Sequence, residues 1–177
     1  TACTGTSGYH SGYGNGNMGT HELVADTDDL YVRFYYKALP GYRWGHEKMM
    51  TFQSRSGQPQ YAILDVGYFG NPVLALYGPI QDRWFQQNLG NNITLTSGRW
   101  YSLEFHAKLN AVGQADGIWE MWVNDCGTNG VCSGTPTLRA RHTDVQYRSA
   151  ADLMGSLWFE NWAGNQTTPP GSDGESY

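Results

Sequence analysis

The sequence lacks any run of about 18 apolar residues, so it offers no candidate for a membrane-spanning helix. Charged residues are also scarce, at 15% of the 177 residues, against about 25% in an average soluble protein. Lysine and arginine together number only 11, and the net charge is -5 with an isoelectric point near 5.4. Because domains that bind nucleic acid usually carry a basic patch and a high isoelectric point, this balance argues against that class.

Cysteine is scarce too, with only Cys3, Cys126 and Cys132. The last two bracket the segment CGTNGVC, whose Gly and Asn residues favour a turn, and we predict a disulfide between them in an oxidising compartment. The alternative is a loop with two reduced thiols, and Cys3 is either free or paired with another chain. No second Cys/His pair stands at ligand spacing, so no zinc site is expected. Because disulfides persist in oxidising environments, the predicted disulfide leads us to expect a secreted or cell-surface protein.

Aromatic residues and glycine are abundant, with 7 Trp, 12 Tyr and 23 Gly, and the aromatic content argues against a disordered chain. Residues 1–22 are rich in Gly, Ser, Asn and Tyr, which predicts an irregular N-terminal arm. Residues 23–177 have the length and composition of one folded domain. The segment TTPPGSDGESY at the end has the composition of a loop.

The domain is predicted to be all-β, an antiparallel β-sandwich of the jelly-roll type. Short runs rich in β-branched and aromatic residues alternate with turn signals, and no window sustains a helical period. Many short strands with a turn every 8–12 residues, roughly, are typical of sandwiches and jelly rolls. The expected strands lie in LYVRFYYKAL, KMMTFQS, YAILDVGYF, PVLALYG, ITLTSGRW, YSLEFHAKLN, GIWEMWVND, TLRARHTDVQY and GSLWFENWAG.

Several of these strands combine an apolar face with a face of ionisable and aromatic residues. In YSLEFHAKLN, Leu103 and Phe105 alternate with Glu104 and His106, because successive side chains of a strand point to opposite sides. Flat rings flanked by polar groups match the apolar face and hydroxyl rim of a sugar. We therefore expect a glycan groove; the alternative is that a loop or a partner chain covers Trp122, Trp158 and Trp162.

The segment RWYSLEFHAKLNAVGQADGIWEMWVND has Glu-x-His-x-Lys, an Asn and a Gly-x-x-Asp-Gly turn before a strand with Trp-Val. It resembles a motif of the concanavalin A-like lectin/glucanase jelly-roll superfamily, in its polysaccharide-lyase-like branch of glucuronan and alginate lyases. LYVRFYYKALPGYRWGHEKMMTF resembles that branch's early strands, and GSLWFENWAG with GESY resembles the segment before its last strand. The resemblance covers approximately residues 30–177 and implies a jelly roll that acts on or binds carbohydrate.

The sequence also departs from that branch. Its members usually continue past the Gly-Glu-x-Tyr segment into a closing strand, which we expect either to lie outside this sequence or to come from a neighbouring chain. The alginate-lyase signatures Gln-x-His and Tyr-x-Lys-Ala-Gly are absent, as is the Glu-x-Asp-x-x-Glu motif of a sister glycosidase family. The partners expected are therefore a polysaccharide and, through the arm or an open sheet edge, another copy of the chain.

The first functional hypothesis is a lyase that cleaves an acidic polysaccharide by β-elimination. Such an enzyme neutralises a uronate carboxylate, removes the neighbouring proton and protonates the leaving oxygen. We predict that Arg33 and Gln53 neutralise the carboxylate and that His106 is the base, since imidazole titrates near neutrality. Tyr35 or Tyr61 would deliver the proton. The alternative role of His106 is structural, as a surface imidazole held between its strand neighbours Glu104 and Lys108.

Substrate binding would fall to the cations and the rings of the polar face. Lysine side chains would hold the acidic sugars, and the other members would line the groove. The predicted binding residues are Lys48, Glu104, Lys108, Glu120, Trp122, Trp158, Glu160 and Trp162.

Two other functions stay open. A non-catalytic glycan-binding or assembly domain would use the same rings without chemistry. A glycoside hydrolase would use Glu120 and Glu160 as a carboxylate pair flanking one glycosidic bond. No cofactor is predicted, although jelly rolls of this superfamily often hold a structural Ca²⁺. Asp26, Asp28 and Asp29 form an acidic turn, which we interpret as an ordinary polar turn.

Overall fold

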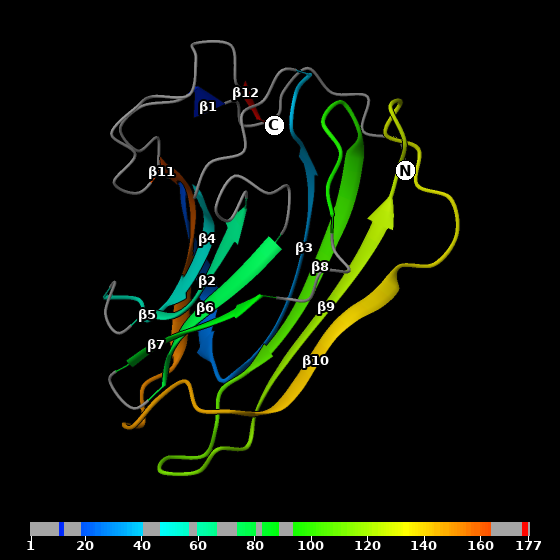
Figure 1. The fold of residues 1–177 in the computed structure, drawn as a ribbon. Coiled ribbons are helices and arrows are strands. Elements are labelled where there is room, and N and C mark those ends of the chain that lie inside the picture. Colours follow the sequence, from blue (N-terminus) through cyan, green and yellow to red (C-terminus); the bar gives the residue numbers. More distant parts are fainter. Residues whose placement is uncertain are drawn as a thin grey trace.

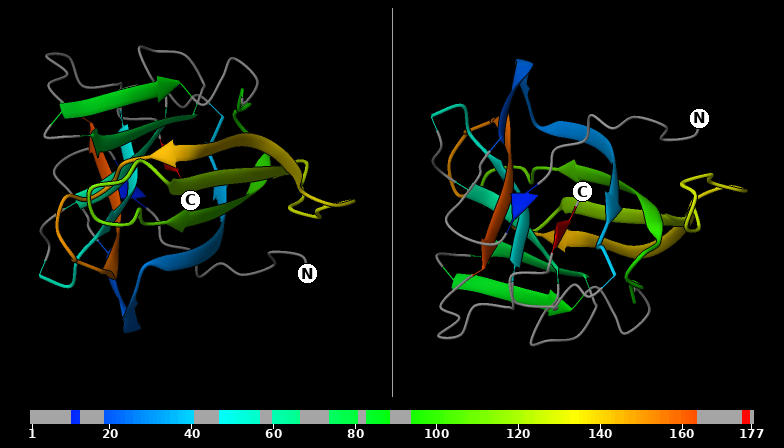
Figure 2. Two further views of the ribbon diagram at one scale, coloured as in Figure 1. Left: turned by 90° about the horizontal axis from the view of Figure 1, so that it is seen from below. Right: turned by 90° about the horizontal axis from the view of Figure 1, so that it is seen from above.

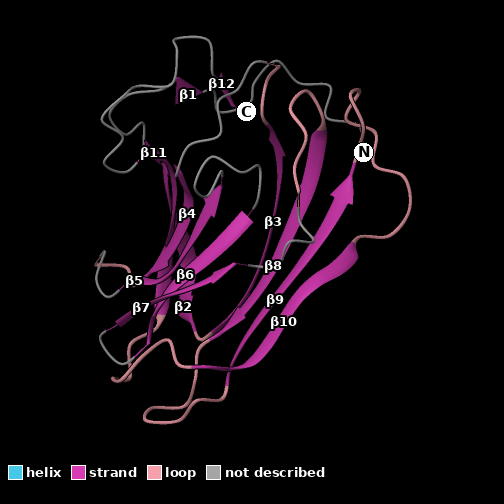
Figure 3. Ribbon diagram, viewed as in Figure 1, coloured by secondary structure: helices cyan, strands magenta, loops and turns pink. Residues whose placement is uncertain are grey.

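The computed structural model describes residues 11–12, 19–40, 47–56, 60–66, 74–80, 83–88, 94–163 and 175–176, with side chains for 21–40, 49–56, 61 and 94–159. Within these ranges strands are the only regular secondary structure, and loops and turns join them (Figure 3). Among the described residues, no helix is long and apolar enough to cross a membrane. The strands are β1 (Ser11–Gly12), β2 (Gly19–Thr27), β3 (Asp29–Lys37), β4 (Glu47–Gln53), β5 (Gln60–Val66), β6 (Leu74–Ile80), β7 (Arg83–Asn88), β8 (Trp100–Lys108), β9 (Gly117–Asp125), β10 (Thr137–Val145), β11 (Met154–Ala163) and β12 (Glu175–Ser176).

The strands form two large antiparallel sheets, which lie as separate layers in Figures 1 and 2. One sheet has the order β10-β9-β8-β3, and the other has the order β2-β11-β4-β5-β6-β7. Strand β11 pairs with both β2 and β4, although it follows them by more than a hundred residues. Such a crossover connection is characteristic of jelly rolls. The predicted all-β antiparallel sandwich is therefore confirmed.

Aromatic rings from both sheets meet in the core between the two layers. Phe52 of β4 approaches Trp119 of β9 with ring centroids 5.6 Å apart and nearly perpendicular planes. Phe105 of β8 lies 5.4 Å from Trp119 and 6.5 Å from Phe52. All three side chains are fully buried. Their contact fixes which face of each strand looks inward, because successive side chains alternate.

The buried side chain of Asn110 ties the end of β8 to the segment that follows β10. Its Oδ1 accepts hydrogen bonds from the backbone N–H groups of Tyr147 (2.7 Å) and Arg148 (2.9 Å). Its Nδ2 donates to the carbonyl oxygens of Ala111 (2.8 Å) and Arg148 (2.9 Å). The amide thereby uses both donors and both acceptor positions, as a buried polar group requires. The Asn of the lyase-like motif is thus structural here.

The Gly-x-x-Asp-Gly turn of the same motif is also explained by packing. The Oδ1 atom of Asp116 accepts a hydrogen bond from the Ala111 N–H at 2.8 Å and closes the turn between β8 and β9. A Cβ atom at Gly117 would lie 2.5 Å from the carbonyl oxygen of Val145 and 2.9 Å from the ring of Tyr147. No side chain fits there without a shift of the backbone. The motif that carries the resemblance therefore specifies the fold.

The predicted disulfide between Cys126 and Cys132 is present. Its loop is anchored to the start of β8, because Trp100 N–H donates to the Gly127 carbonyl oxygen at 2.8 Å. The Cys126 N–H in turn donates to the Trp100 carbonyl oxygen, also at 2.8 Å. The loop therefore extends the β8–β9 pairing beyond Asp125.

Several segments differ from the sequence-based expectation, including the short paired strands β1 in the expected arm and β12 in the expected C-terminal loop. Strand β2 begins at Gly19, inside the segment expected to be an irregular arm, and β7 covers RWFQQN, where no strand was expected. Both are edge strands of the six-stranded sheet, and one of them, β2, shows no regular alternation of apolar and polar residues. In ITLTSGRW, regular strand structure begins only at Trp100. Pairing with a neighbouring strand, rather than hydrophobic pattern, therefore decides these elements.

Candidate functional site

The outer face of the four-stranded sheet carries a row of side chains, one from each strand. Tyr31 of β3 pairs with His106 of β8, His106 pairs with Glu120 of β9, and Glu120 pairs with Arg141 of β10. The residues that alternate with them along each strand, such as Phe105 on β8 and Trp119 on β9, point into the core. The polar and aromatic face expected from the alternation of these strands is therefore present.

His106 is held on three sides. Its Nδ1 lies 2.8 Å from Glu120 Oε2, its Nε2 lies 2.9 Å from Asp29 Oδ1, and the Tyr31 ring stacks on it at 4.0 Å with an interplanar angle of 2°. Only 7% of the side chain is exposed. Since each ring nitrogen lies within hydrogen-bond distance of a carboxylate oxygen, both nitrogens are engaged within the protein and neither is free to contact a substrate. The sequence left open a structural role for His106 between Glu104 and Lys108; its ring nitrogens instead contact Asp29 and Glu120.

The next row of this face is dominated by an ion pair. Arg33 donates from Nη2 and Nε to Glu104 Oε2 at 2.6 Å and 2.9 Å. Trp122 follows Glu104 across the sheet and is half-buried between it and Leu138. Tyr35 lies in a third row, opposite Ser102.

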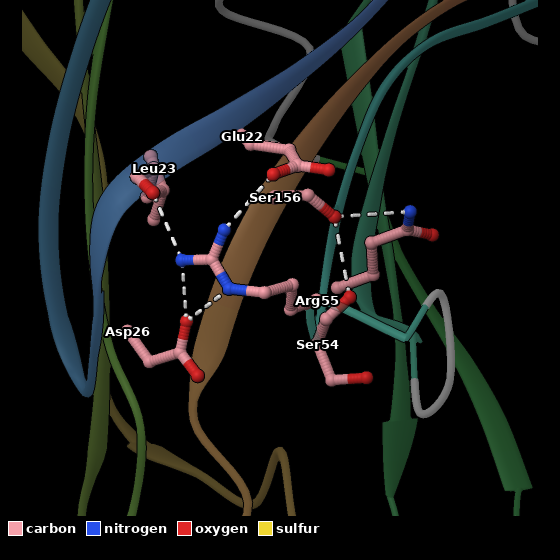
Figure 4. A network of polar contacts seen from close by, with 7 residues as sticks. Glu22, Leu23, Asp26, Ser54, Arg55 and Ser156 are labelled. Atoms are coloured by element: carbon pink, nitrogen blue, oxygen red, sulfur yellow. Dashed lines mark hydrogen bonds and ion pairs between the residues drawn. The ribbon is translucent and has the colours of Figure 1, made fainter.

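The outer face of the six-stranded sheet carries a different polar group. Because Phe52 faces the core, Gln53 and Ser156, which are paired on β4 and β11, lie on the outer side of the sheet. Gln53 is only 1% exposed, and its Nε2 donates to Ser156 Oγ at 3.2 Å. Ser156 Oγ donates in turn to the Ser54 carbonyl oxygen at 3.2 Å (Figure 4). Among the described residues, Gln53 Oε1 has no hydrogen-bond partner.

Other predicted binding residues lie on these same two strands. Trp158 is half-buried and pairs with Thr51. Thr51 lies two residues before Gln53 on β4, so these residues share one face of the sheet. Lys48 of β4 pairs with Trp162 of β11, and Glu160 lies between the two tryptophans in sequence. The side chains of Lys48, Glu160 and Trp162 are outside the described residues.

The structure thus divides the predicted site between two opposite faces of the sandwich. Gln53 lies on one sheet and His106, Arg33 and Tyr35 lie on the other, so Gln53 and His106 cannot act on the same sugar unit. Residues on the four-stranded sheet are Arg33, Tyr35, Glu104, His106, Lys108, Glu120 and Trp122; those on the six-stranded sheet are Lys48, Gln53, Trp158, Glu160 and Trp162.

The carboxylate pair expected of a glycoside hydrolase is wrong for the same reason. Glu120 is on β9 of the four-stranded sheet, and Glu160 is on β11 of the six-stranded sheet. The two oxygens of Glu120 are already engaged, by His106 at 2.8 Å and by Arg141 Nε at 3.1 Å. Both members of such a pair must flank one glycosidic bond, which the two sheets prevent.

The acidic turn does not gather its carboxylates around one point. Arg55 donates to Asp26 Oδ1 from Nε (3.0 Å) and Nη2 (2.7 Å), and also binds Glu22 and the Leu23 carbonyl oxygen (Figure 4). Asp29 faces His106 on the other sheet. In the part of the chain that the structure describes, no three His, Cys, Asp or Glu residues are placed to hold a metal ion. The Arg55 contacts instead fasten edge strand β2 to the end of β4.

Tyr61, the alternative proton donor, is completely buried against the core. Its hydroxyl donates to the Leu153 carbonyl oxygen at 3.4 Å. Burial, followed by the nearby negative charge of Asp152, raises the pKa of Tyr61 to about 12. The phenol therefore keeps its proton throughout the neutral range.

We expect the Tyr61→Phe variant to lose less stability than the wild type between pH 10 and about 12. A folded-state pKa above the unfolded value stabilises the protein below pH 10, and this contribution disappears as pH rises through the folded pKa. Two pKa units correspond to about 2.7 kcal/mol. Urea unfolding across this range measures the difference. Tyr147, whose pKa burial also raises, remains in both proteins, and identical pH slopes would contradict the prediction.

Comparison with known proteins places the fold. No protein-family model and no curated protein sequence matches the chain. Among solved structures, the PL-14 alginate lyase from Aplysia kurodai matches with a TM-score of 0.63 and 16% identity, over 88% of this chain and 69% of that one. The chain has the jelly-roll fold of polysaccharide lyases.

Two further structures support this conclusion. The endo-β-1,4-glucuronan lyase from Trichoderma reesei matches with a TM-score of 0.59 and 13% identity, over 95% of this chain and 71% of the lyase. The alginate lyase Aly36B matches with a TM-score of 0.61 and 16% identity, over 90% and 70%. The resemblance seen in the sequence is therefore confirmed for the fold, and the low identity makes the relationship distant.

Proposed function

We propose that this protein binds an acidic polysaccharide along β4 and β11 and cleaves it by β-elimination. In this reaction a base takes the proton of the C–H bond beside a uronate carboxylate, the electron pair of that bond forms a C=C bond, and the C–O bond to the next sugar breaks. The leaving oxygen takes a proton. The structural neighbours include lyases of alginate and of glucuronan, both of which are uronate polymers. The disulfide between Cys126 and Cys132 supports a secreted or cell-surface location for such an activity.

The observation that carries the proposal is the buried amide of Gln53. A buried acceptor without a partner costs about 1–3 kcal/mol, and Gln53 Oε1 is such an acceptor among the described residues. A sugar hydroxyl that donates to Oε1 would remove this cost. In the proposed complex the second N–H of Nε2 donates to a uronate carboxylate, since the first donates to Ser156.

The residue types beside Gln53 suit the same ligand. Trp158 supplies a half-buried ring on the same face, and rings of this kind stack on the apolar face of a sugar. Lys48 lies on the same strand as Gln53 and supplies positive charge for an acidic chain. These three residues were all predicted from the sequence to contact substrate.

The test is incubation with alginate, a glucuronan and a neutral β-glucan, followed by the ultraviolet absorbance of the new C=C bond. We expect absorbance with a uronan and none with the glucan. Gln53→Ala should lower kcat/KM about 10- to 100-fold, the loss expected for hydrogen bonds to a charged substrate. Gln114→Ala, the same change in the exposed β8–β9 turn, is the control. Absence of unsaturated product from every uronan would refute the reaction.

A non-catalytic glycan-binding role is the second candidate. It is favoured by the engagement of both His106 nitrogens, which leaves the predicted base without a free ring nitrogen. Binding of a uronan with no increase in ultraviolet absorbance would support this role over the lyase.

A further inference from the structure

On the outer face of the four-stranded sheet the arginine is the more exposed member of each Arg–Glu ion pair, whereas Asp29, which contacts His106, is 44% exposed. In the Arg33–Glu104 pair the exposed fractions are 56% and 25%, and in the Arg141–Glu120 pair they are 62% and 13%. Lys108 is exposed on the same face. The whole protein has a net charge of -5, so the exposed cationic groups of this face contrast with the net negative charge of the chain. At these two pairs an approaching ligand meets the guanidinium group before its carboxylate partner, which favours an anionic partner there.

The same face holds an exposed aromatic ring in a fixed orientation. Tyr31 is 63% exposed, yet its inner surface stacks on His106 at 4.0 Å. Asp29 and Glu120 hold the His106 ring in place, so Tyr31 stacks on a side chain that is itself ordered. A ring that is already ordered loses little conformational entropy when a ligand stacks on it.

A second ring lies two strands away. Trp122 on β9 belongs to the row next to that of Tyr31, beside the Arg33–Glu104 pair. Adjacent strands are about 4.8 Å apart, so the two rings are separated by about 10 Å across the sheet. Rings at this spacing with guanidinium groups beside them suit an extended polymer that has alternating apolar faces and negative charges.

From these observations we infer that the outer face of the four-stranded sheet is a second, non-catalytic binding surface for acidic polysaccharide. Tyr31 and Trp122 stack on sugar rings, and Arg33 and Arg141 contact carboxylates. The inference shares its polymer class with the proposed function and rests on that assignment, but it uses the opposite sheet. The surface would hold the protein on the polymer while β4 and β11 engage another part of the chain.

The test is electrophoresis in native gels that contain alginate, with gels containing polyphosphate or a neutral glucan for comparison. The double variant Tyr31→Ala/Arg141→Gln should bind alginate about tenfold more weakly than the wild type. Arg99→Gln, which removes an exposed arginine from the Arg99–Asp125 ion pair at the sheet end, should bind alginate within about twofold of the wild type. Thermal unfolding of each variant confirms that it is folded.

Three results would overturn the inference: alginate retention unchanged in the double variant, equal retention of the wild type by polyphosphate, or equal retention by the neutral glucan. Cleavage of an alginate trisaccharide separates this surface from the reaction. If the double variant cleaves the trisaccharide normally but loses retention, the two sites are independent as inferred. If no uronan is cleaved yet retention depends on Tyr31 and Arg141, the proposed reaction fails and the binding surface stands.

Discussion

Replacing Asn110 by alanine is expected to lower the free energy of unfolding by about 4 kcal/mol. The substitution removes four hydrogen bonds and leaves the N–H groups of Tyr147 and Arg148 without their acceptor. Each unsatisfied buried group costs about 1–3 kcal/mol. Arg148 is also bound to the Asn110 carbonyl oxygen through Nε and to the Asp152 carbonyl oxygen through Nη1, so the disturbance reaches the approach to β11.

Urea denaturation measures this effect, with Asn124→Ala as the matched control. Asn124 is half-buried and makes one side-chain hydrogen bond, from Nδ2 to the Gly134 carbonyl oxygen at 3.3 Å. Its replacement should cost about 1 kcal/mol or less. If the two alanine variants have equal stability, Asn110 does not have the structural role assigned to it.

Replacing Trp119 by alanine is expected to cost about 4 kcal/mol, within the range of about 3–5 kcal/mol for a buried tryptophan. The indole is fully buried and contacts both sheets, through Phe105 of β8 and Phe52 of β4. Its loss would leave a cavity between the two sheets and would remove the ring against which Phe52 of β4 packs. Since Gln53 follows Phe52 directly, the same variant should also weaken binding of a uronan.

Trp119→Phe separates the ring contacts from the indole nitrogen. Trp119 Nε1 is buried and has no hydrogen-bond partner among the described residues, so its removal loses no hydrogen bond there. Phenylalanine keeps an aromatic face for Phe52 and Phe105, and we expect a cost of about 1–2 kcal/mol, less than half that of alanine. Thermal and urea unfolding check the order of the variants. A phenylalanine variant as unstable as the alanine variant would contradict this account.

The sequence allowed good prediction wherever a strand has one buried and one exposed face. The alternation in β8 and β9 correctly assigned Phe105 and Trp119 to the core and Glu120 and Trp122 to the outer face. The turn composition of CGTNGVC correctly indicated the disulfide. Strand β2 was missed, because its place at a sheet edge leaves Val24 fully exposed and removes the hydrophobic alternation.

The partners of His106 show where local pattern is insufficient. Sequence spacing suggested Glu104 and Lys108, the residues two positions away on the same face. The observed partners are Glu120, which lies directly opposite on β9, and Asp29, at the start of β3. Cross-strand neighbours on one face approach to about 4.5–5.5 Å, closer than residues two positions apart on one strand. Register therefore decided the chemistry of this imidazole.

By itself, the sequence determined the fold class, the inward and outward sides of the main strands and the polar turn that joins β8 to β9. Only the tertiary structure decided that Gln53 and His106 belong to opposite faces of the sandwich. The physical reason is that side-chain alternation is a local property of each strand, whereas membership of a sheet depends on pairing between distant segments. Strand β11, inserted between β2 and β4, brings Ser156 beside Gln53 across more than a hundred residues, and no local pattern encodes that contact.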